Sequence, residues 1–298
     1  MGRDACEASP AARAVFDAAD AALGFPLSRL CFEGPEQELR RTELQQPALL
    51  TTSIALLRGF QEVAGELAAD YFGGHSLGEY TALVASGALD FEDAVRVVHL
   101  RGRLMQEAVA PGRGGMAAVM GCEPEVVREA CARAARERGE VVAPANYNSP
   151  QQTVIAGELA AVERARALAK ELGAKRVVPL PVSAPFHCSL MAPAAEKLRP
   201  ELERLAFRKP RRPVVSNVEA RPNDDPTRIA ALLEQQVTAP VRFTEMVECL
   251  AALGVDTFLE VGSGRVLSGL IARIDRRARR GNLSAWADVE EVRALLAG

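Results

Sequence analysis

Apolar residues recur along the chain at two spacings, one typical of helices and the other of strands. Spacings of three and four predict helices over residues 10–22, 47–64, 90–109, 189–205, 227–236 and 243–253. Short apolar runs predict strands at 67–74, 214–215 and 257–261. Asp90 is expected to cap its helix, and residues 27–32 are too short and mixed to assign. Because strands alternate with helices, the pattern favours an α/β domain with a mainly parallel sheet.

A second pattern begins near residue 113, where strands and helices follow one another in the order β-α-β-β-α-β. Its elements are a strand at 116–120, a helix at 124–138, strands at 141–145 and 153–156, a helix at 159–172 and a strand at 176–182. This order is that of a ferredoxin-like domain. We therefore expect an α/β-hydrolase-like catalytic domain of residues 1–112 and 183–298, interrupted by a ferredoxin-like insert of residues 113–182.

The composition is that of a soluble globular protein, with 48% hydrophobic and 25% charged residues among 298. The net charge of -3, spread over intermixed residues, argues against nucleic-acid binding, and we interpret the basic run at 276–280 as a solvated helix end. No apolar run is long enough to span a membrane, and the first residues do not resemble a signal peptide. Six scattered cysteines indicate reduced thiols and no metal site. These features predict a cytoplasmic protein.

The pentapeptide Gly74-x-Ser76-x-Gly78 lies between a predicted strand and a helix expected from Glu79. A sharp turn in this context exposes a serine hydroxyl at the end of a sheet and requires small residues on either side. The N–H groups at the start of the helix can stabilise an oxyanion. Ser76 is therefore a candidate nucleophile, and the alternative is a glycine-rich turn with an exposed serine.

A nucleophilic serine needs a base, because its free hydroxyl reacts poorly at neutral pH. The chain has three histidines. His75 should leave its strand on the face opposite Ser76, and His99 lies among apolar residues of a predicted helix, where packing explains it. His187 follows the insert in a loop, where functional residues often lie. It is the candidate base, with a structural histidine as the alternative.

Arg101 lies in a predicted helix, and most helical arginines are solvated. A guanidinium can also bind a carboxylate through two parallel hydrogen bonds. The residue pattern leaves both interpretations open.

Segments in order along the chain resemble the malonyl-CoA:acyl-carrier-protein transacylase family, from Met1 to about residue 275. They are Gln45-Gln46-Pro47-Ala48, Gly74-His75-Ser76-Leu77-Gly78-Glu79-Tyr80, Arg101-Gly102-Arg103-Leu104-Met105-Gln106, Asn146-Tyr147-Asn148-Ser149-Pro150, Pro185-Phe186-His187-Cys188 and Glu260-Val261-Gly262-Ser263-Gly264. The resemblance implies that malonyl passes from malonyl-CoA to a serine and then to the phosphopantetheine thiol of an acyl carrier protein. The product would enter fatty-acid or polyketide synthesis, and no metal or other cofactor would be needed.

The resemblance also implies roles for individual residues. Ser76 would carry the malonyl group, His187 would activate it, and the backbone carbonyl of Gln236 would orient His187. The N–H of Leu77 would contribute to the oxyanion hole, and Arg101 would bind the free carboxylate of malonyl. The other substrate-binding positions would be Met105, Met116, Phe186, His75 and Asn148. We expect a monomer that acts on malonyl-CoA and an acyl carrier protein.

The family pattern begins with a strand and a Gly-Gln-Gly-Ser-Gln loop, whose Gln supplies a second oxyanion N–H, and this sequence contains neither. Loss of one such donor typically lowers the rate by about 10²- to 10³-fold. We therefore expect the natural gene to begin upstream of Met1. Two alternative functions stay open: a serine thioesterase or hydrolase with water as acceptor, and an inactive, N-terminally truncated family member.

Overall fold

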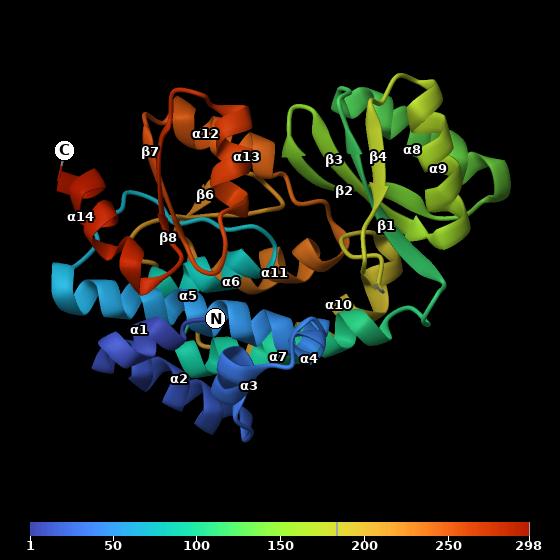
Figure 1. The fold of residues 1–298 in the computed structure, drawn as a ribbon. Coiled ribbons are helices and arrows are strands. Elements are labelled where there is room, and N and C mark those ends of the chain that lie inside the picture. The colour runs from blue at the N-terminus through green and yellow to red at the C-terminus, as the bar shows by residue number, and fades with distance from the viewer. Residues whose placement is uncertain (183, 298) are drawn as a thin grey trace.

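The computed structural model describes residues 1–182 and 184–297. Residue 183, where we place the return to the large domain, and residue 298 lie outside the described residues. Two long helices, α5 (Thr42–Ala64) and α7 (Phe91–Glu107), pack side by side through the large domain. The insert, drawn in green and yellow, stands at one end of this helical layer (Figure 1).

The insert contains a four-stranded sheet covered on one face by two helices (Figure 1). Its strands are β1 (Gly114–Met120), β2 (Val142–Ser149), β3 (Gln152–Glu158) and β4 (Arg176–Pro179), and its helices are α8 (Pro124–Arg138) and α9 (Leu159–Glu171). The strand order is β2-β3-β1-β4, with antiparallel pairing throughout. This is the ferredoxin-like arrangement that the element order predicts.

The two faces of the insert sheet serve different cores, because successive residues of a strand point in opposite directions. Ala117 and Val119 of β1 pack with the apolar residues of α8 and α9. Met116 and Ala118 point the other way and pack near Phe186, in the loop that leads to the candidate base. The uncovered face of the insert sheet therefore lies against the loop that carries the candidate base.

The large domain is mainly helical, and most of the expected helices are present. Besides α5 and α7 it contains α1 (Arg3–Ala8), α2 (Pro10–Leu23), α3 (Leu27–Glu33), α4 (Glu36–Leu39), α6 (Leu77–Ala85), α10 (Ala192–Arg204), α11 (Ile229–Thr238), α12 (Phe243–Ala252), α13 (Val266–Ile274), α14 (Val289–Ala297) and the 3₁₀ turns η1 (Ser189–Met191), η2 (Pro226–Arg228) and η3 (Trp286–Asp288). As predicted, Asp90 caps α7, where its carboxylate accepts the N–H of Glu92 at 3.0 Å. No helix in the described ranges is both long and apolar enough to cross a membrane.

The parallel sheet expected in the large domain is present only in part. Its strands are β5 (Val214–Val215), β6 (Pro222–Asn223), β7 (Thr257–Val261) and β8 (Arg279–Leu283). β7 pairs with β8 in parallel, whereas β5 and β6 are antiparallel. The strand predicted at 67–74 was wrong, since within this described segment only Phe72 pairs as a strand residue, through an isolated parallel bridge to Val214. Leu67 and Phe72 of this segment pack against the core. Apolar residues indicate burial, and they do not show whether the backbone pairs with a neighbouring strand.

The basic run at 276–280 is solvated as expected, but it does not end a helix. Arg279 and Arg280 begin β8, where they pair with Thr257 and Phe258. Ala278 and Leu283 are buried on this stretch. Exposed arginines are compatible with an edge strand, so their presence did not distinguish a strand from a helix end.

Candidate active site

Ser76 occupies a strained turn at the start of α6. Its backbone has φ 53° and ψ -106°, a conformation that residues other than glycine adopt rarely. A Cβ added at Gly74 would lie 2.2 Å from the carbonyl of Gly78, so the turn excludes any side chain at position 74. At Gly78 an added Cβ would meet no atom within 4 Å. The expected requirement for small residues therefore holds on one side of the serine only.

The structure brings Ser76 and His187 together across 111 residues of sequence. The Oγ atom of Ser76 lies 2.7 Å from Nε2 of His187, and Nδ1 of His187 lies 2.8 Å from the backbone oxygen of Gln236. A carbonyl oxygen can only accept a hydrogen bond, so Nδ1 carries the proton and Nε2 is free to accept from the serine hydroxyl. Burial and the positive charge of Arg101 lower the pKa of His187 to about 3. The imidazole is therefore neutral at physiological pH.

Arg101 is buried, with 1% of its surface exposed, which excludes the interpretation as a solvated helical arginine. Nη1 donates to Oε1 of Gln46 at 2.7 Å, and Nη2 donates to Oε1 of Gln236 at 2.9 Å. Nη2 also lies 3.1 Å from Oγ of Ser76. The guanidinium carbon lies 5.4 Å from the centre of the Tyr80 ring. Within the described residues Nε has no hydrogen-bond partner.

The next residue, Gly102, allows the helix that carries Arg101 to approach the start of α5 closely. A Cβ at this position would lie 2.5 Å from the backbone oxygen of Thr42 and 2.7 Å from Cα of Glu43. The close approach places Gln46 of α5 within hydrogen-bonding distance of Arg101. The glycine after Arg101 therefore has a packing reason.

A buried polar network that the sequence reasoning missed holds the turn in place. Asn217 accepts the N–H of Ser76 on Oδ1 at 2.6 Å and donates from Nδ2 to the oxygen of Gly74 at 2.7 Å. Oε2 of Glu79 accepts the N–H of Asn217 at 3.0 Å and Nε2 of Gln236 at 2.7 Å. Gln236 Nε2 also donates to the backbone oxygen of Ser76 at 3.0 Å. Burial raises the pKa of the Glu79 carboxyl to about 7, although these donors and Arg101 oppose the rise.

The signal for this network in the sequence was weak. Glu79 belongs to the segment that contains the serine, and Asn217 follows the short strand Val214–Val215. A polar residue at the end of a buried strand is a common site position, but which backbone groups it contacts depends on the tertiary fold. Gln46 was likewise noted only within a matched segment.

The remaining candidate residues lie where the two domains meet. Met105 belongs to the core of the large domain and Met116 to the cluster on the insert sheet, and Phe186 packs against both clusters. Nε2 of His75 lies 2.8 Å from Oδ1 of Asn148 on β2, so His75 joins the turn to the insert. The N–H of Leu77, at the first position of α6, has no hydrogen-bond partner in the parts that the structure describes.

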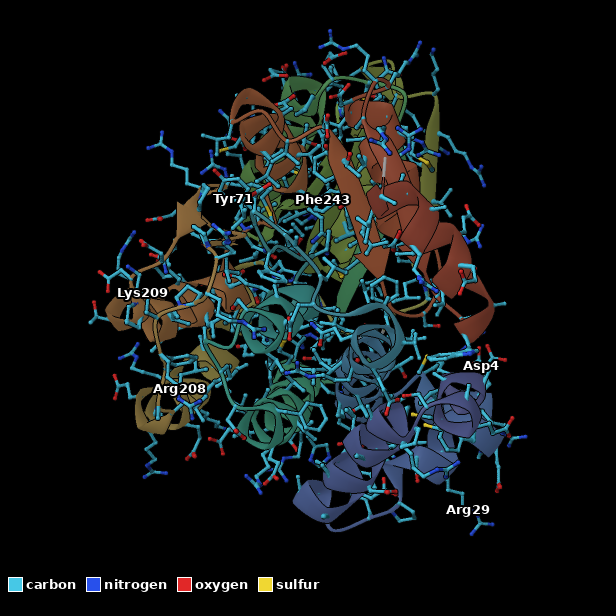
Figure 2. The ribbon with its side chains drawn as sticks, turned by 90° about the vertical axis from the view of Figure 1, so that its left-hand side faces the viewer. Asp4, Arg29, Tyr71, Arg208, Lys209 and Phe243 are labelled. Atoms are coloured by element: carbon cyan, nitrogen blue, oxygen red, sulfur yellow. The ribbon has the colours of Figure 1, made fainter. Side chains whose placement is uncertain are left out.

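His75 and His99 also make ring-to-ring contacts with phenylalanine side chains. The ring of His75 lies 5.7 Å from that of Phe243, which lies near Tyr71 (Figure 2). Burial lowers the pKa of His75. The ring of His99 lies 5.5 Å from that of Phe25, which fits the packing role expected for it.

Other features offer no competing chemistry in the described residues. No group of three or more His, Cys, Asp or Glu side chains there is placed to hold a metal ion. A cavity of about 430 Å³ is lined by Phe72 and Arg211 among others, and one of about 360 Å³ by Tyr71 among others. Arg212 borders both, and none of the candidate site residues lines either. Arg208 and Lys209, which precede these arginines, lie at the outer surface (Figure 2).

Residues 1–275 match the family model described as the acyl transferase domain. The chain belongs to this acyl transferase family. It is 49% identical over 274 residues to the malonyl CoA-acyl carrier protein transacylase of Escherichia coli strain K12, covering 92% of this chain and 88% of that protein. With the transacylase of Bacillus subtilis strain 168 it shares 48% identity over 279 residues, covering 94% and 87%.

Solved acyl transferase structures have the same fold. The acyl carrier protein S-malonyltransferase of Vibrio cholerae superposes with a TM-score of 0.95 at 45% identity, covering 98% of this chain and 94% of that one. A malonyl-transacylase in complex with a type II polyketide synthase acyl-carrier protein gives a TM-score of 0.95 at 45% identity, covering 100% and 95%. These matches confirm the predicted fold class of this acyl transferase.

Proposed function

We propose that this acyl transferase moves malonyl from malonyl-CoA to the phosphopantetheine thiol of an acyl carrier protein, through an ester on Ser76. The observation that carries the proposal is the placement of a buried guanidinium 3.1 Å from a nucleophile that is already hydrogen-bonded to a neutral histidine. The malonyl transacylases that resemble the chain over most of its length support the same substrate and acceptor.

Acylation begins when Ser76 Oγ attacks the thioester carbonyl and its proton passes to Nε2 of His187. The carbonyl of Gln236 keeps Nδ1 protonated and the ring oriented, as an Asp side chain does in other triads. The N–H of Leu77 faces the developing oxyanion from the start of α6. Collapse of the tetrahedral intermediate breaks the C–S bond, and the coenzyme A thiol leaves with the proton from His187.

The second half-reaction runs through the same groups. His187 takes the proton of the carrier-protein thiol, and the thiolate attacks the carbonyl of the malonyl ester on Ser76. Collapse now breaks the C–O bond, and the proton returns to Ser76 Oγ. Because the thioester already activates the acyl group, we propose that no cofactor takes part; a cytoplasmic location and a monomeric state belong to the same proposal.

Arg101 accounts for the choice of a carboxylated acyl group. Its Nε–H and Nη2 lie on the same edge of the guanidinium, Nε has no partner among the described residues, and Nη2 faces Ser76. A carboxylate bound to this edge by two hydrogen bonds, one of them from Nη2 in place of its contact with Ser76, would hold the acyl group against the nucleophile. Simple ester hydrolysis needs no such group, which favours acyl transfer over the thioesterase alternative.

The acyl pocket would be lined by side chains from both domains. Met105 and Phe186 come from the large-domain side and Met116 from the insert, with His75 and Asn148 at its edge. The ring of Phe186 would restrict branching at the α-carbon of the acyl group. We therefore expect methylmalonyl-CoA to be a poor substrate, by about 10-fold or more for the added methyl group.

The deciding experiment is intact-mass analysis after incubation with malonyl-CoA. The wild type should gain one malonyl group, Ser76→Ala should gain none, and the control Ser86→Ala should behave as wild type, since Ser86 is buried at the end of α6 away from the turn. Addition of a carrier protein should discharge the ester to its thiol. An adduct that persists in Ser76→Ala would refute the assignment, and rapid discharge to water without carrier would favour the thioesterase.

A further inference from the structure

The positive charge of Arg101 is buried, and no carboxylate of the described residues forms a salt bridge with it. Within the described residues its hydrogen bonds go to uncharged oxygens of Gln46, Gln236 and Ser76. A buried ion without compensation is strongly unfavourable, so a compensating charge is expected nearby.

Glu79 provides a carboxylate one side chain away. The amide of Gln236 lies between the two groups, with Oε1 accepting from Nη2 of Arg101 at 2.9 Å and Nε2 donating to Oε2 of Glu79 at 2.7 Å. The amide dipole is therefore aligned with both charges, which strengthens each hydrogen bond. Glu79 is itself 4% exposed, so both members of the pair are buried away from bulk solvent.

Glu79 is placed to change its protonation without losing its contacts. Both hydrogen bonds described for its carboxylate, from Asn217 and from Gln236, go to Oε2, and Oε1 has no partner among the described residues. The titratable or charged groups that act on it are Arg101 from α7 and its neighbour Tyr80 on α6; Gln236 of α11 and Asn217 are neutral. Burial holds its pKa near physiological pH.

We propose that Glu79 balances the charge of Arg101 in the empty site and takes up a proton from solvent when an acyl carboxylate binds to Arg101. The proposal rests on the proposed function, because it needs a carboxylated acyl group. The incoming carboxylate supplies the negative charge that Arg101 requires, and an ionised Glu79 then repels it. Glu79 is thus a positioning residue that acts through Gln236 and sets the pH dependence of substrate selection.

The linkage has a definite sign. Above pH 7 Glu79 is mostly ionised before the substrate binds. Binding of malonyl then requires either that Glu79 takes up a proton or that its carboxylate repels the malonyl carboxylate. The KM for malonyl-CoA should therefore rise by about tenfold between pH 6 and pH 8, as expected for one coupled proton opposed by a buried charge. Acetyl-CoA has the same coenzyme A phosphates and no acyl carboxylate. Its KM should therefore change much less than that of malonyl-CoA between pH 6 and pH 8. His187 does not contribute, because its pKa of about 3 leaves it neutral throughout.

The direct test is calorimetry on Ser76→Ala, which binds malonyl-CoA without being acylated. Titrations at pH 7.5 in buffers of different ionisation enthalpy count the protons taken up. Malonyl-CoA should take up about half a proton or more, and acetyl-CoA should take up clearly less. Equal uptake for the two ligands would overturn the proposal.

The variant Glu79→Gln assigns the proton. A Gln oxygen in the place of Oε2 can accept the same two N–H groups, so the turn should persist while the charge is lost. In Ser76→Ala/Glu79→Gln the extra uptake should vanish and malonyl-CoA should bind as tightly or more tightly. Glu260→Gln is the matched control, since Glu260 also accepts backbone N–H groups, from Leu267 and Ser268, away from Arg101. Uptake that survives Glu79→Gln, or that vanishes in Glu260→Gln, would contradict the assignment.

The outcome is separable from that of the proposed function. If malonyl-CoA acylates Ser76 and its KM is independent of pH from 6 to 8, only the inference on Glu79 fails. If malonyl-CoA neither binds nor acylates the protein, the proposed function fails first. The wild-type pH profile needs no variant, so the test stands even if Glu79→Gln folds poorly.

Discussion

The insert sheet and the nucleophile turn are stabilised in opposite ways. In the insert, seven consecutive residue pairs join β1 to β3, and the backbone groups are satisfied by neighbouring strands. Around Ser76, the preceding segment makes a single described bridge, and the backbone of Gly74 and Ser76 is held by the side chain of Asn217. The first arrangement depends on the pattern of apolar residues, and the second depends on the identity of a few polar ones.

This difference determines what a substitution does in each region. A ladder of main-chain bonds survives most side-chain changes that keep the core filled. A turn held by side chains loses its geometry when one of them is shortened, because the freed backbone groups stay buried and unpaired. We therefore expect changes in the insert to lower stability without changing the rate, and changes around the turn to affect the rate as well as stability.

The largest effect should come from Asn217→Ala. The change leaves the N–H of Ser76 and the oxygen of Gly74 without their partner. A displacement of the nucleophile by about 1 Å lowers a rate by about 10²-fold, so kcat/KM for malonyl transfer should fall by about that factor or more. Steady-state kinetics with a carrier protein measure the loss.

The matched control is Asn223→Ala, which removes a buried asparagine whose side chain donates to the backbone oxygen of Asp225, in the chain segment after β6. It should keep kcat/KM within about threefold of wild type. Equal losses in the two variants would mean that asparagine burial in general, and not the hold on the turn, limits the rate.

The next effect concerns stability against pH. Burial raises the pKa of Glu79 from its ordinary value of 4.5 to about 7 in the folded protein, so the folded state holds a proton that the unfolded state has released between these pH values. The free energy of unfolding should therefore fall as pH rises through this window, by up to about 3 kcal/mol, and Glu79→Gln should remove this fall. Urea unfolding of both proteins from pH 5 to 8 measures the difference.

His187 acts with the opposite sign in a lower window. Its pKa falls from 6.5 to about 3 on folding, so its contribution makes the protein more stable as pH rises through that range. His187 contributes equally to the free energy of unfolding of the wild type and of Glu79→Gln, so its contribution cancels when one value is subtracted from the other. If the difference in the free energy of unfolding between the two proteins is independent of pH from 5 to 8, Glu79 is not protonated in the folded protein over this range.

A smaller effect is expected for Arg101→Ala, and it should depend on the acyl group. A hydrogen bond to a charged group contributes about 1.5–3 kcal/mol, so malonyl transfer should fall by about 10- to 10²-fold. Acetyl transfer should be kept or increased, because the carboxylate contact does not exist for that substrate. Equal losses for malonyl and acetyl would assign Arg101 to the support of the turn instead of substrate choice.

The smallest effect tests the insert side of the comparison. Ile155 is buried in the core between the sheet and its helices, and Ile155→Val should lower the free energy of unfolding by about 0.5–1.5 kcal/mol. The kcat/KM of the folded enzyme should not change measurably. A loss of rate without a loss of stability would mean that the insert core is coupled to the site.

The sequence allowed prediction of the parts that local pattern determines. Successive residues of the insert strand β1 face two different cores, Asp90 caps α7 through neighbouring N–H groups, and Gly74 marks a turn that tolerates no side chain. Each of these depends on residues close in sequence. The serine turn is recognisable for the same reason, whereas His187 follows from elimination among three histidines.

Features that depend on contacts between distant segments were missed or wrong. Asn217 meets Ser76 across 141 residues, and Gln236 meets Glu79 across 157, so no local spacing indicates the network. The strand expected at 67–74 required backbone partners that an apolar run does not identify. The burial of Arg101 likewise depends on Gln46 and Gln236, from two other helices.

The position of Phe186 affects how the two domains can be exchanged between relatives. This residue precedes His187 and packs against both the large-domain core and the insert sheet, while Pro185 lies so close to Gly114 that an added Cβ there would be 2.4 Å away. A chimaera that takes residues 113–182 from another family member therefore replaces the face of the insert sheet that contacts Pro185 and Phe186. This contact positions the loop that carries His187. Foreign inserts that preserve this surface should yield working hybrids, and inserts that alter it should yield folded proteins in which Ser76 has no base.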